Sequence, residues 1–238
     1  MLICYSDYPD LFNLPVQYAP LSQQVGDSYL ILERDDLSFY KNGVKFISAK
    51  DCYNSLLQDK HQSTIDILKR KGRLPQQVVD GTGGWGRDAL TFAQAGITVL
   101  LYEQHELPVI FLKYALQRWF PSLQKKITIH HQCFSTHSLT VAECVYLDPM
   151  FFDDKKSLSK KSMQSLYELF PSDKLEQFQT LKSGLLKLKI ETLVTKQPKH
   201  ASSWIQGIMK HERFNRTCRF DIYYINNQLL NETHFRKN

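Results

Sequence analysis

Short apolar runs and longer amphipathic stretches alternate regularly along the chain from residue 76 onward. Short apolar runs are typical of buried strands, and stretches with apolar residues three or four positions apart are typical of helices. The runs predict strands at residues 77–80, 97–103, 127–129, 144–147, 190–195 and 219–225. The stretches predict helices at residues 87–94, 106–120, 161–170 and 173–188. Strands that alternate with helices of this length indicate an α/β protein with a doubly wound, mostly parallel sheet.

The N-terminal part of the chain follows a different pattern. Two turn signals, Asp35-Asp36 and Asn42-Gly43, separate short β-prone segments. Turn residues at this spacing favour antiparallel hairpins. Strands are therefore predicted at residues 28–33, 37–41 and 44–47.

An amphipathic stretch links this part to the regular alternation. Ile65 and Leu68 lie three positions apart on one face of residues 62–71, and Gly72 closes the stretch. This pattern predicts a short helix. The change of pattern indicates two domains, a small N-terminal α/β appendage at residues 1–72 and a larger domain at residues 73–238.

A glycine-rich turn joins the first strand of the larger domain to its first helix, with the sequence Asp80-Gly81-Thr82-Gly83-Gly84-Trp85-Gly86-Arg87-Asp88. Glycines allow a backbone turn to approach a ligand beyond the carboxyl end of a strand. Read literally, Gly81-x-Gly83-x-x-Gly86 matches the dinucleotide fingerprint, which favours an NAD(P)-dependent oxidoreductase. Asp80 argues against this, because its charge would lie near a pyrophosphate. The spacing Asp80-x-Thr82-x-Gly84-x-Gly86 is instead similar to the first motif of S-adenosylmethionine-dependent methyltransferases, whose ligand carries an ammonium group.

An acid also ends the second strand of the larger domain: Glu103, 22 positions after Gly81. A carboxylate at this place accepts hydrogen bonds from ribose hydroxyls, whether the ligand is NAD or S-adenosylmethionine. Glu103 therefore supports a nucleoside ligand without choosing between the two.

A second motif follows the fourth strand, with the sequence Val145-Tyr146-Leu147-Asp148-Pro149-Met150-Phe151-Phe152. It resembles the Asp/Asn-Pro-Pro-Tyr/Phe loop of methyltransferases that modify exocyclic amines of bases. Such an amine is a poor nucleophile because its lone pair is delocalised into the ring. Accepting its N–H groups at Asp148 and at the Pro149 carbonyl frees the lone pair and stabilises the positive charge that develops. We expect Phe151 to stack on the base and align it.

Basic residues are concentrated in one part of the chain. The net charge is +6, but residues 155–219 contain 14 Lys/Arg against 5 Asp/Glu, so the remainder is slightly acidic. Clustered positive charge favours a polyanion such as RNA. The candidate phosphate ligands follow the fourth and fifth strands and would share one edge of the sheet: Lys155, Lys156, Lys160, Lys161, Lys196 and Lys199. Trp204 and Phe214 are candidates for base stacking, although a tryptophan at helical spacing is more often part of the core.

Five scattered cysteines form no Cys-x-x-Cys pair, which argues against a disulfide framework and against a zinc site. They indicate reduced thiols in a cytoplasmic protein. His130, His131, Cys133 and His137 lie close together, but their spacing does not complete a metal site, so we expect no metal. The N-terminus lacks the features of a signal peptide, and the longest apolar runs are too short to span a bilayer, so no membrane partner is expected.

With these residues in place, the chain resembles the RsmJ family, S-adenosylmethionine-dependent methyltransferases of guanine N2 in the 16S ribosomal RNA of the small subunit. The resemblance is carried by the glycine turn, the Asp148 motif with Lys160, Lys161 and Met163 behind it, the run Val194-Thr195-Lys196-Gln197-Pro198, and the run Arg219-Phe220-Asp221-Ile222-Tyr223. It implies a class I Rossmann-like methyltransferase fold. It also implies S-adenosylmethionine as cofactor, and ribosomal RNA or the small ribosomal subunit as partner.

The resemblance further implies a cofactor site made of the glycine turn and the strand ends that follow it: Asp80, Thr82, Gly84, Gly86, Arg87, Asp88, Glu103, Gln104, Cys133, Phe134 and Asp148. Gln104 and Gln197 stand where the family has arginine, and Phe152 stands where it has proline. Because of Gln104 and Phe152, a non-catalytic RNA-binding or ribosome-assembly protein on the same fold is a second alternative. The acceptor chemistry itself serves the N6 amine of adenine as well as guanine N2.

Overall fold

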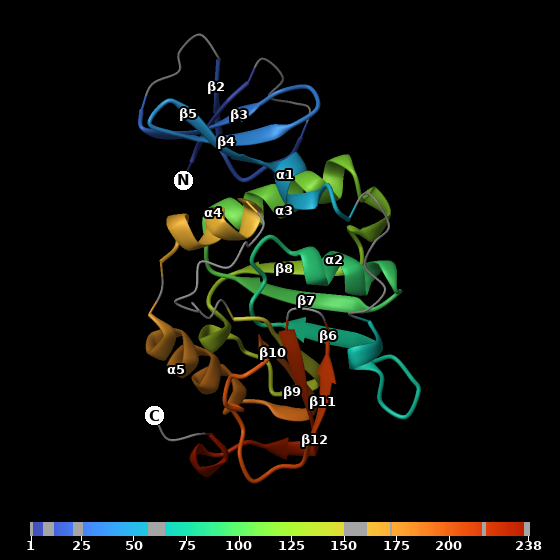
Figure 1. Cartoon of the computed structure of the whole chain (residues 1–238). Helices are drawn as coiled ribbons and strands as arrows, with labels where there is room; N and C mark the ends of the chain where they lie inside the picture. The colour runs from blue at the N-terminus through green and yellow to red at the C-terminus, as the bar shows by residue number, and fades with distance from the viewer. Residues whose placement is uncertain are drawn as a thin grey trace.

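The structure, a computed structural model, describes residues 2–6, 12–20, 26–56, 65–149, 161–171, 173–215 and 218–235. The chain forms a small N-terminal sheet and a larger sheet, with helices between and around them (Figure 1). This is the predicted α/β architecture with an N-terminal appendage. No helix in these ranges is both long and apolar enough to cross a membrane.

The N-terminal sheet has the strand order β2-β1-β3-β4-β5. Its strands are β1 (Ile3–Tyr5), β2 (Gln17–Ala19), β3 (Ser28–Leu32), β4 (Leu37–Lys41) and β5 (Val44–Ser48). The antiparallel ladder of β3, β4 and β5 confirms the three predicted strands. Asn42 and Gly43, between β4 and β5, have positive φ angles of 52° and 73°, as a tight hairpin turn requires. The sequence pattern does not predict β1 and β2, which are only three residues long.

The prediction of a helix at residues 62–71 is wrong for the part that the structure describes, which begins at residue 65. This part contains a single 3-10 turn, η4 (Asp66–Leu68). Lys71 and Gly72 have positive φ angles of 49° and 78° and form a tight reverse turn. Leu68 is buried in the core that the two sheets share, so tertiary packing decides the conformation here. The domain boundary at residue 72 stays a prediction.

The larger sheet has the strand order β11-β12-β10-β9-β6-β7-β8. Its strands are β6 (Gln77–Asp80), β7 (Thr98–Glu103), β8 (Ile127–His131), β9 (Val141–Leu147), β10 (Lys189–Pro198), β11 (Lys210–Phe214) and β12 (Cys218–Leu229). All predicted strands of the larger domain are present, and the sequence pattern does not predict β11. The neighbouring strands β10, β9, β6, β7 and β8 are parallel to one another, whereas β12 is antiparallel to β10 and β11. From β6 the chain continues to β7 and β8 on one side, and it then returns to β9 and β10 on the other side. Ligands of such sheets bind where the strand order reverses in this way, here between β6 and β9, beyond the carboxyl ends of the strands.

Helices cover both faces of the larger sheet. They are α1 (Ala49–Tyr53), α2 (Arg87–Gln94), α3 (Glu106–Arg118), α4 (Lys161–Leu169) and α5 (Lys174–Leu185), and α1, α3 and α4 lie between the two sheets (Figure 1). Neighbouring strand residues point to opposite faces. Val78 belongs to a core with α2, α3 and the N-terminal sheet, whereas Val79 belongs to a second core with α5. Trp204 is buried in that second core, so it packs and does not stack on RNA.

Candidate functional site

The glycine-rich turn between β6 and α2 is fastened to the strands on both sides of β6. The N–H of Gly81 donates to the carbonyl of Tyr146 in β9 (3.1 Å), and the N–H of Gly83 donates to that of Tyr102 in β7 (2.9 Å). Gly86, the N-cap of α2, has a φ angle of 72°, and a Cβ atom there would lie 2.6 Å from the Leu112 side chain. A side chain at this position would therefore distort the turn.

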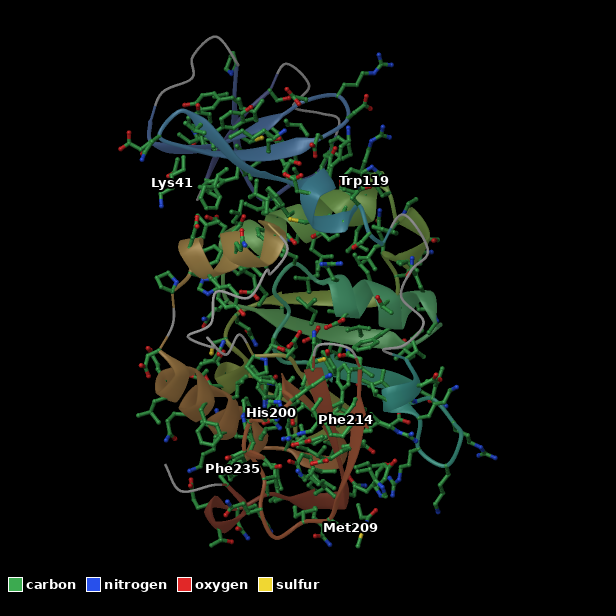
Figure 2. The ribbon with its side chains drawn as sticks, in the orientation of Figure 1. Lys41, Trp119, His200, Met209, Phe214 and Phe235 are labelled. Atoms are coloured by element: carbon green, nitrogen blue, oxygen red, sulfur yellow. The ribbon has the colours of Figure 1, made fainter. Side chains whose placement is uncertain are left out.

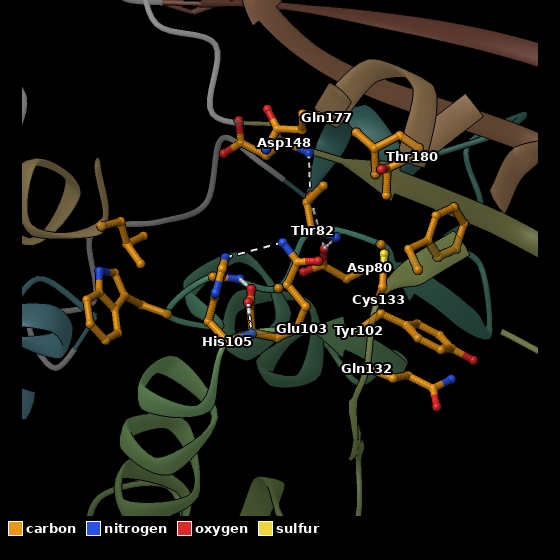
Figure 3. Close-up of a pocket in the computed structure, with 18 of the residues that line it drawn as sticks. Asp80, Thr82, Tyr102, Glu103, His105, Gln132, Cys133, Asp148, Gln177 and Thr180 are labelled. Atoms are coloured by element: carbon orange, nitrogen blue, oxygen red, sulfur yellow. Dashed lines mark hydrogen bonds between the residues drawn. The ribbon is translucent and has the colours of Figure 1, made fainter. Parts of the chain in front are cut away.

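A cavity of about 310 Å³ lies at the carboxyl edge of the larger sheet, next to this turn (Figure 3). Its volume is in the range of small-ligand sites. Ten of the eleven residues predicted to bind the cofactor line it: Asp80, Thr82, Gly84, Arg87, Asp88, Glu103, Gln104, Cys133, Phe134 and Asp148. The eleventh, Gly86, belongs to the turn at the start of α2. The structure thus brings together residues that follow β6, β7, β8 and β9.

Two buried acids hold the turn and the start of the next loop. Asp80 Oδ1 accepts the N–H of Thr82 (3.0 Å). Glu103 Oε2 accepts the N–H of Gly84 (2.6 Å), and its Oε1 accepts the N–H of His105 (2.7 Å). Asp80 Oδ1 also accepts the hydroxyl of Thr82 (3.4 Å). The two oxygens of an ionised carboxylate offer about four acceptor positions in all, so each acid is able to bind a ligand while it holds the backbone.

The same two acids have raised pKa values. Burial raises the pKa of Asp80 to about 8, with a backbone hydrogen bond opposing and the neighbouring Asp88, Asp148 and Glu103 adding to the rise. Burial also raises the pKa of Glu103 to about 7, against three backbone hydrogen bonds that lower it. A positively charged ligand relieves the mutual repulsion of these groups.

Asp148, the predicted acceptor, stands beside a lysine of the neighbouring strand. Lys196 Nζ donates to Asp148 Oδ2 and lies 3.8 Å from Asp88 Oδ2. The N–H of Asp148 donates to Thr82 Oγ1 (2.7 Å), and the hydroxyl of Tyr146 donates to Asp88 Oδ2 (2.8 Å). Lys196, predicted as a phosphate ligand, thus faces two carboxylates inside the site.

Sequence reasoning missed the wall of the cavity that α5 provides. This wall consists of Glu176, Gln177, Thr180 and Leu181, with Pro171 before the helix. α5 approaches the segment after β8 so closely that a Cβ atom at Gly184 would lie 2.5 Å from the Phe134 ring. No motif marks the wall residues. Gly184, a glycine inside a predicted helix, is the signal of close packing that was available in the sequence.

Other predicted residues lie away from the cavity or outside the described ranges. Phe151, Lys155, Lys156 and Lys160 fall outside these ranges, as does the side chain of Lys161. Pro149 is buried, and Lys199 is half-buried just beyond β10. Phe214 is 59% exposed at one end of β11, and the exposed Met209 precedes the other end (Figure 2). Phe214 therefore stays a candidate for base stacking.

The side chains around the cavity fit S-adenosylmethionine better than a dinucleotide. Asp88 and Asp148 line the cavity beside the turn where a dinucleotide would place its pyrophosphate, and their charges would repel it. The same charges attract the sulfonium and ammonium groups of S-adenosylmethionine, and Glu103 has lone pairs for ribose hydroxyls. Within the described ranges, no three His, Cys, Asp or Glu side chains are grouped closely enough to hold a metal ion.

Comparison with known proteins points to the same ligand. Residues 18–225 match the model of a family described as "Putative SAM-dependent methyltransferase". The chain is 30% identical over 213 residues to the ribosomal RNA small subunit methyltransferase J of Francisella tularensis subsp. novicida, which covers 83% of this chain and 87% of that protein. It is 32% identical over 166 residues to the protein of the same name from Mannheimia succiniciproducens, which covers 66% of this chain and 65% of that protein.

The solved structures support the fold. The crystal structure of a SAM-dependent methyltransferase from Neisseria gonorrhoeae matches this chain with a TM-score of 0.63 and 19% sequence identity. The match covers 95% of this chain and 97% of that chain. The predicted class I methyltransferase fold is thereby confirmed.

Proposed function

The chain belongs to the S-adenosylmethionine-dependent methyltransferase family and uses that cofactor, and we propose that it methylates the exocyclic N2 of a guanine in the 16S ribosomal RNA of the small subunit. The observation that carries this proposal is the Asp148 carboxylate, which follows a strand end, lines the cofactor cavity and precedes Pro149. The names of the relatives, ribosomal RNA small subunit methyltransferase J, support the RNA substrate. The NAD(P) alternative loses its basis, because the family accounts for the same glycine turn.

Asp148 and Pro149 supply the two acceptors that an exocyclic amine needs. The Asp148 carboxylate accepts one N–H of the amine and the Pro149 carbonyl accepts the other, which draws the nitrogen toward a pyramidal shape and frees its lone pair. When bound, S-adenosylmethionine supplies an electrophilic methyl group, and the electron pair of the broken C–S bond stays on sulfur. The methylated nitrogen then loses one proton, which Asp148 accepts or passes to water.

We assign the cofactor contacts to the residues that line the cavity. Glu103, at the end of β7, accepts hydrogen bonds from the ribose hydroxyls. Asp80 and Asp88 face the ammonium group at the amino acid end. Cys133 and Phe134, which follow β8, border the adenine.

We propose that RNA approaches the site at the lysines that follow β9 and β10 in the sequence. Lys199 follows β10, and the lysines at 155–161 follow Asp148 in the sequence. Each phosphate contact adds affinity that falls with salt and carries no sequence information. We place the reaction in the cytoplasm, because the free cysteines fit a reducing compartment and ribosomal subunits are assembled there.

Transfer of labelled methyl groups to small subunits that lack the modification tests this proposal. We expect the wild-type protein to label the RNA and Asp148→Asn to lose about 100-fold or more in kcat, because the amide has no charge to stabilise the methylated amine. Asp66→Asn, which changes an exposed acid paired with Lys69 (2.6 Å), is the control and should match the wild type. Mapping the labelled nucleotide decides between guanine N2 and adenine N6.

Three outcomes would contradict parts of the proposal. No labelling by the wild type would favour the non-catalytic RNA-binding alternative. Equal labelling by the wild type and Asp148→Asn would remove Asp148 from the mechanism. Thermal stabilisation by NADH and not by S-adenosylhomocysteine would contradict the cofactor.

A further inference from the structure

We propose that Lys196 is a positioning residue for methyl transfer: it binds one oxygen of Asp148 and keeps this carboxylate ionised, so that the other oxygen, Oδ1, receives the amine of the base. This inference rests on the proposed function and gives Lys196 a role other than phosphate binding. The contacts at the carboxyl ends of β9 and β10 carry it.

The register of two parallel strands brings Lys196 to Asp148. Thr195 pairs with Leu147 in the ladder between β10 and β9, so Lys196 and Asp148, which follow these two residues, lie at the same level. Lys196 Nζ donates to Asp148 Oδ2, and the N–H of Asp148 donates to Thr82 Oγ1 at 2.7 Å. The acceptor is therefore held at its side chain by β10 and at its backbone by the glycine turn.

Lys196 also places a positive charge among acids. The other titratable groups that face the pair come from four elements: Asp80 (β6), Asp88 (α2), Tyr146 (β9) and Cys218 (β12). Burial raises the pKa of Asp148 above its usual value, Lys196 limits this rise, and Asp88 adds to it. Burial opposes the charge on Lys196, but Asp148 and Asp88 outweigh burial and raise its pKa, so the lysine keeps its proton.

Loss of this cation would change the chemistry of the acceptor. Asp148 and Asp88 would then face each other without a shared cation, and like charges in a buried site favour protonation of one of them. A protonated carboxyl group is a poorer acceptor, because one of its oxygens has become a donor. Lys196 therefore preserves the form of Asp148 that the amine requires.

Phosphate binding fits these contacts less well. Lys196 Nζ donates to one carboxylate and lies 3.8 Å from another, so a phosphate at this place would meet two negative charges. Lys199, three positions further on, lies beyond the strand end and is kept as the phosphate ligand.

Lys196 keeps its own proton throughout the reaction. The amine nitrogen forms a bond to the methyl carbon while the electron pair of the C–S bond goes to sulfur. The surplus proton of the nitrogen leaves through Asp148 Oδ1 to water. Asp148 returns to the carboxylate form because Lys196 disfavours its protonated form.

The test compares Lys196→Met with Lys196→Arg in the full chain, with methyl transfer to unmodified small subunits measured from about pH 6 to about pH 9. Without the cation the pKa of Asp148 rises, so kcat of Lys196→Met should fall roughly tenfold or more at the acidic end and recover toward high pH. Lys196→Arg keeps the charge, so its kcat should depend on pH at the acidic end of the range, the acid limb of the profile, as that of the wild type does. KM for the subunit should change little in Lys196→Met, whereas Lys199→Met should raise KM and weaken its salt dependence.

The inference is overturned if Lys196→Met keeps the wild-type acid limb, and a raised, less salt-dependent KM would then make Lys196 a phosphate ligand. Failure of the wild type to transfer methyl groups would overturn the proposed function, and the inference with it. Binding of S-adenosylhomocysteine and thermal unfolding check the fold of each variant. Where Lys196→Met does not fold, Lys196→Gln keeps a hydrogen-bond donor without the charge and gives the same readout.

Discussion

Adjacent residues of β10 belong to two polar networks on opposite faces of the sheet. Lys196 contacts Asp148, which lines the cofactor cavity. Gln197 points to the other face, where its Nε2 donates to Asp221 of β12 (2.7 Å). Both networks lie toward the same edge of the sheet, and each contains a carboxylate paired with a cation. They differ in how completely the carboxylate is satisfied by the protein.

The Asp221 network is closed. Arg219 donates to both oxygens of Asp221 (2.6 and 3.1 Å), and the hydroxyl of Tyr223 donates to one of them (3.3 Å). Arg219 also donates to the carbonyls of Lys199 and Ala201 (3.0 and 2.8 Å), which fixes the segment after β10. The side chain of Asp221 is fully buried. This network is structural, because the protein occupies the oxygens that a ligand would need.

The Asp148 network is open. The side chains of Asp148 and Lys196 are 27% and 29% exposed, Asp148 lines the cavity, and the lysine donates to one carboxylate oxygen. A carboxylate that keeps access to the cavity is able to take a substrate group as a further partner. The contrast shows that an acid next to a cation at a strand end is not enough to indicate function. The two cases differ in whether the protein leaves a carboxylate oxygen accessible to a ligand.

Removing the carboxylate should cost far more stability in the closed network than in the open one. Asp221→Ala leaves the buried charge of Arg219 without its main partner, so we expect a loss of about 3–5 kcal/mol in the free energy of unfolding. Asp148→Ala leaves Lys196 near Asp88 and partly exposed, so we expect a loss of under about 1 kcal/mol. Denaturant unfolding measures both. Equal losses would remove the distinction between the networks.

The acids around the cavity should make the cofactor-free protein less stable as pH rises toward neutrality. The folded-state pKa values, about 8 for Asp80 and about 7 for Glu103, lie above their values of about 4 in an unfolded chain. From about pH 4 to about pH 8 the folded protein therefore binds more protons than the unfolded one, and stability falls through this window.

Thermal unfolding across this pH range measures the effect, with Asp80→Asn as the matched variant. The amide cannot ionise, so the loss of stability with rising pH should be smaller in Asp80→Asn than in the wild type. Parallel curves for the two proteins would show that Asp80 is ionised in the fold. S-adenosylmethionine should stabilise the wild type more at the high end of the range, because the ligand is positively charged and the acids are ionised there.

Gln197→Leu should lower the free energy of unfolding by about 1 kcal/mol, far less than Asp221→Ala in the same network. Gln197 Nε2 donates to Asp221 and to Thr195 Oγ1 (3.1 Å), but its Oε1 is buried without a hydrogen-bond partner among the described residues. The substitution therefore removes two bonds together with an unsatisfied acceptor. Because this side chain does not line the cavity, methyl transfer should stay close to wild type. A clear loss of activity in a stable variant would show that the two networks are coupled.

Local signals in the sequence predict most of the larger domain and much of its site. The glycine turn and the Asp148 motif each occupy a short stretch of chain, where backbone sterics and hydrophobic periodicity act directly. The strand ends are predictable for the same reason, and the carboxyl ends of parallel strands meet at one edge. Glu103 and Asp148 were therefore expected at one cavity although 45 residues separate them, and both line it.

Tertiary structure decided the features that depend on distant partners. The 3-10 turn at Asp66–Leu68 takes its conformation from burial in the shared core, and the α5 wall depends on the packing of Gly184 against Phe134. The partner of Lys196 depends on the register of β9 and β10, because a shift of one residue would exchange the faces of the strand. In the sequence Lys196 is one of several lysines near strand ends. Only the register, which the whole sheet determines, turns it toward a carboxylate 48 positions away.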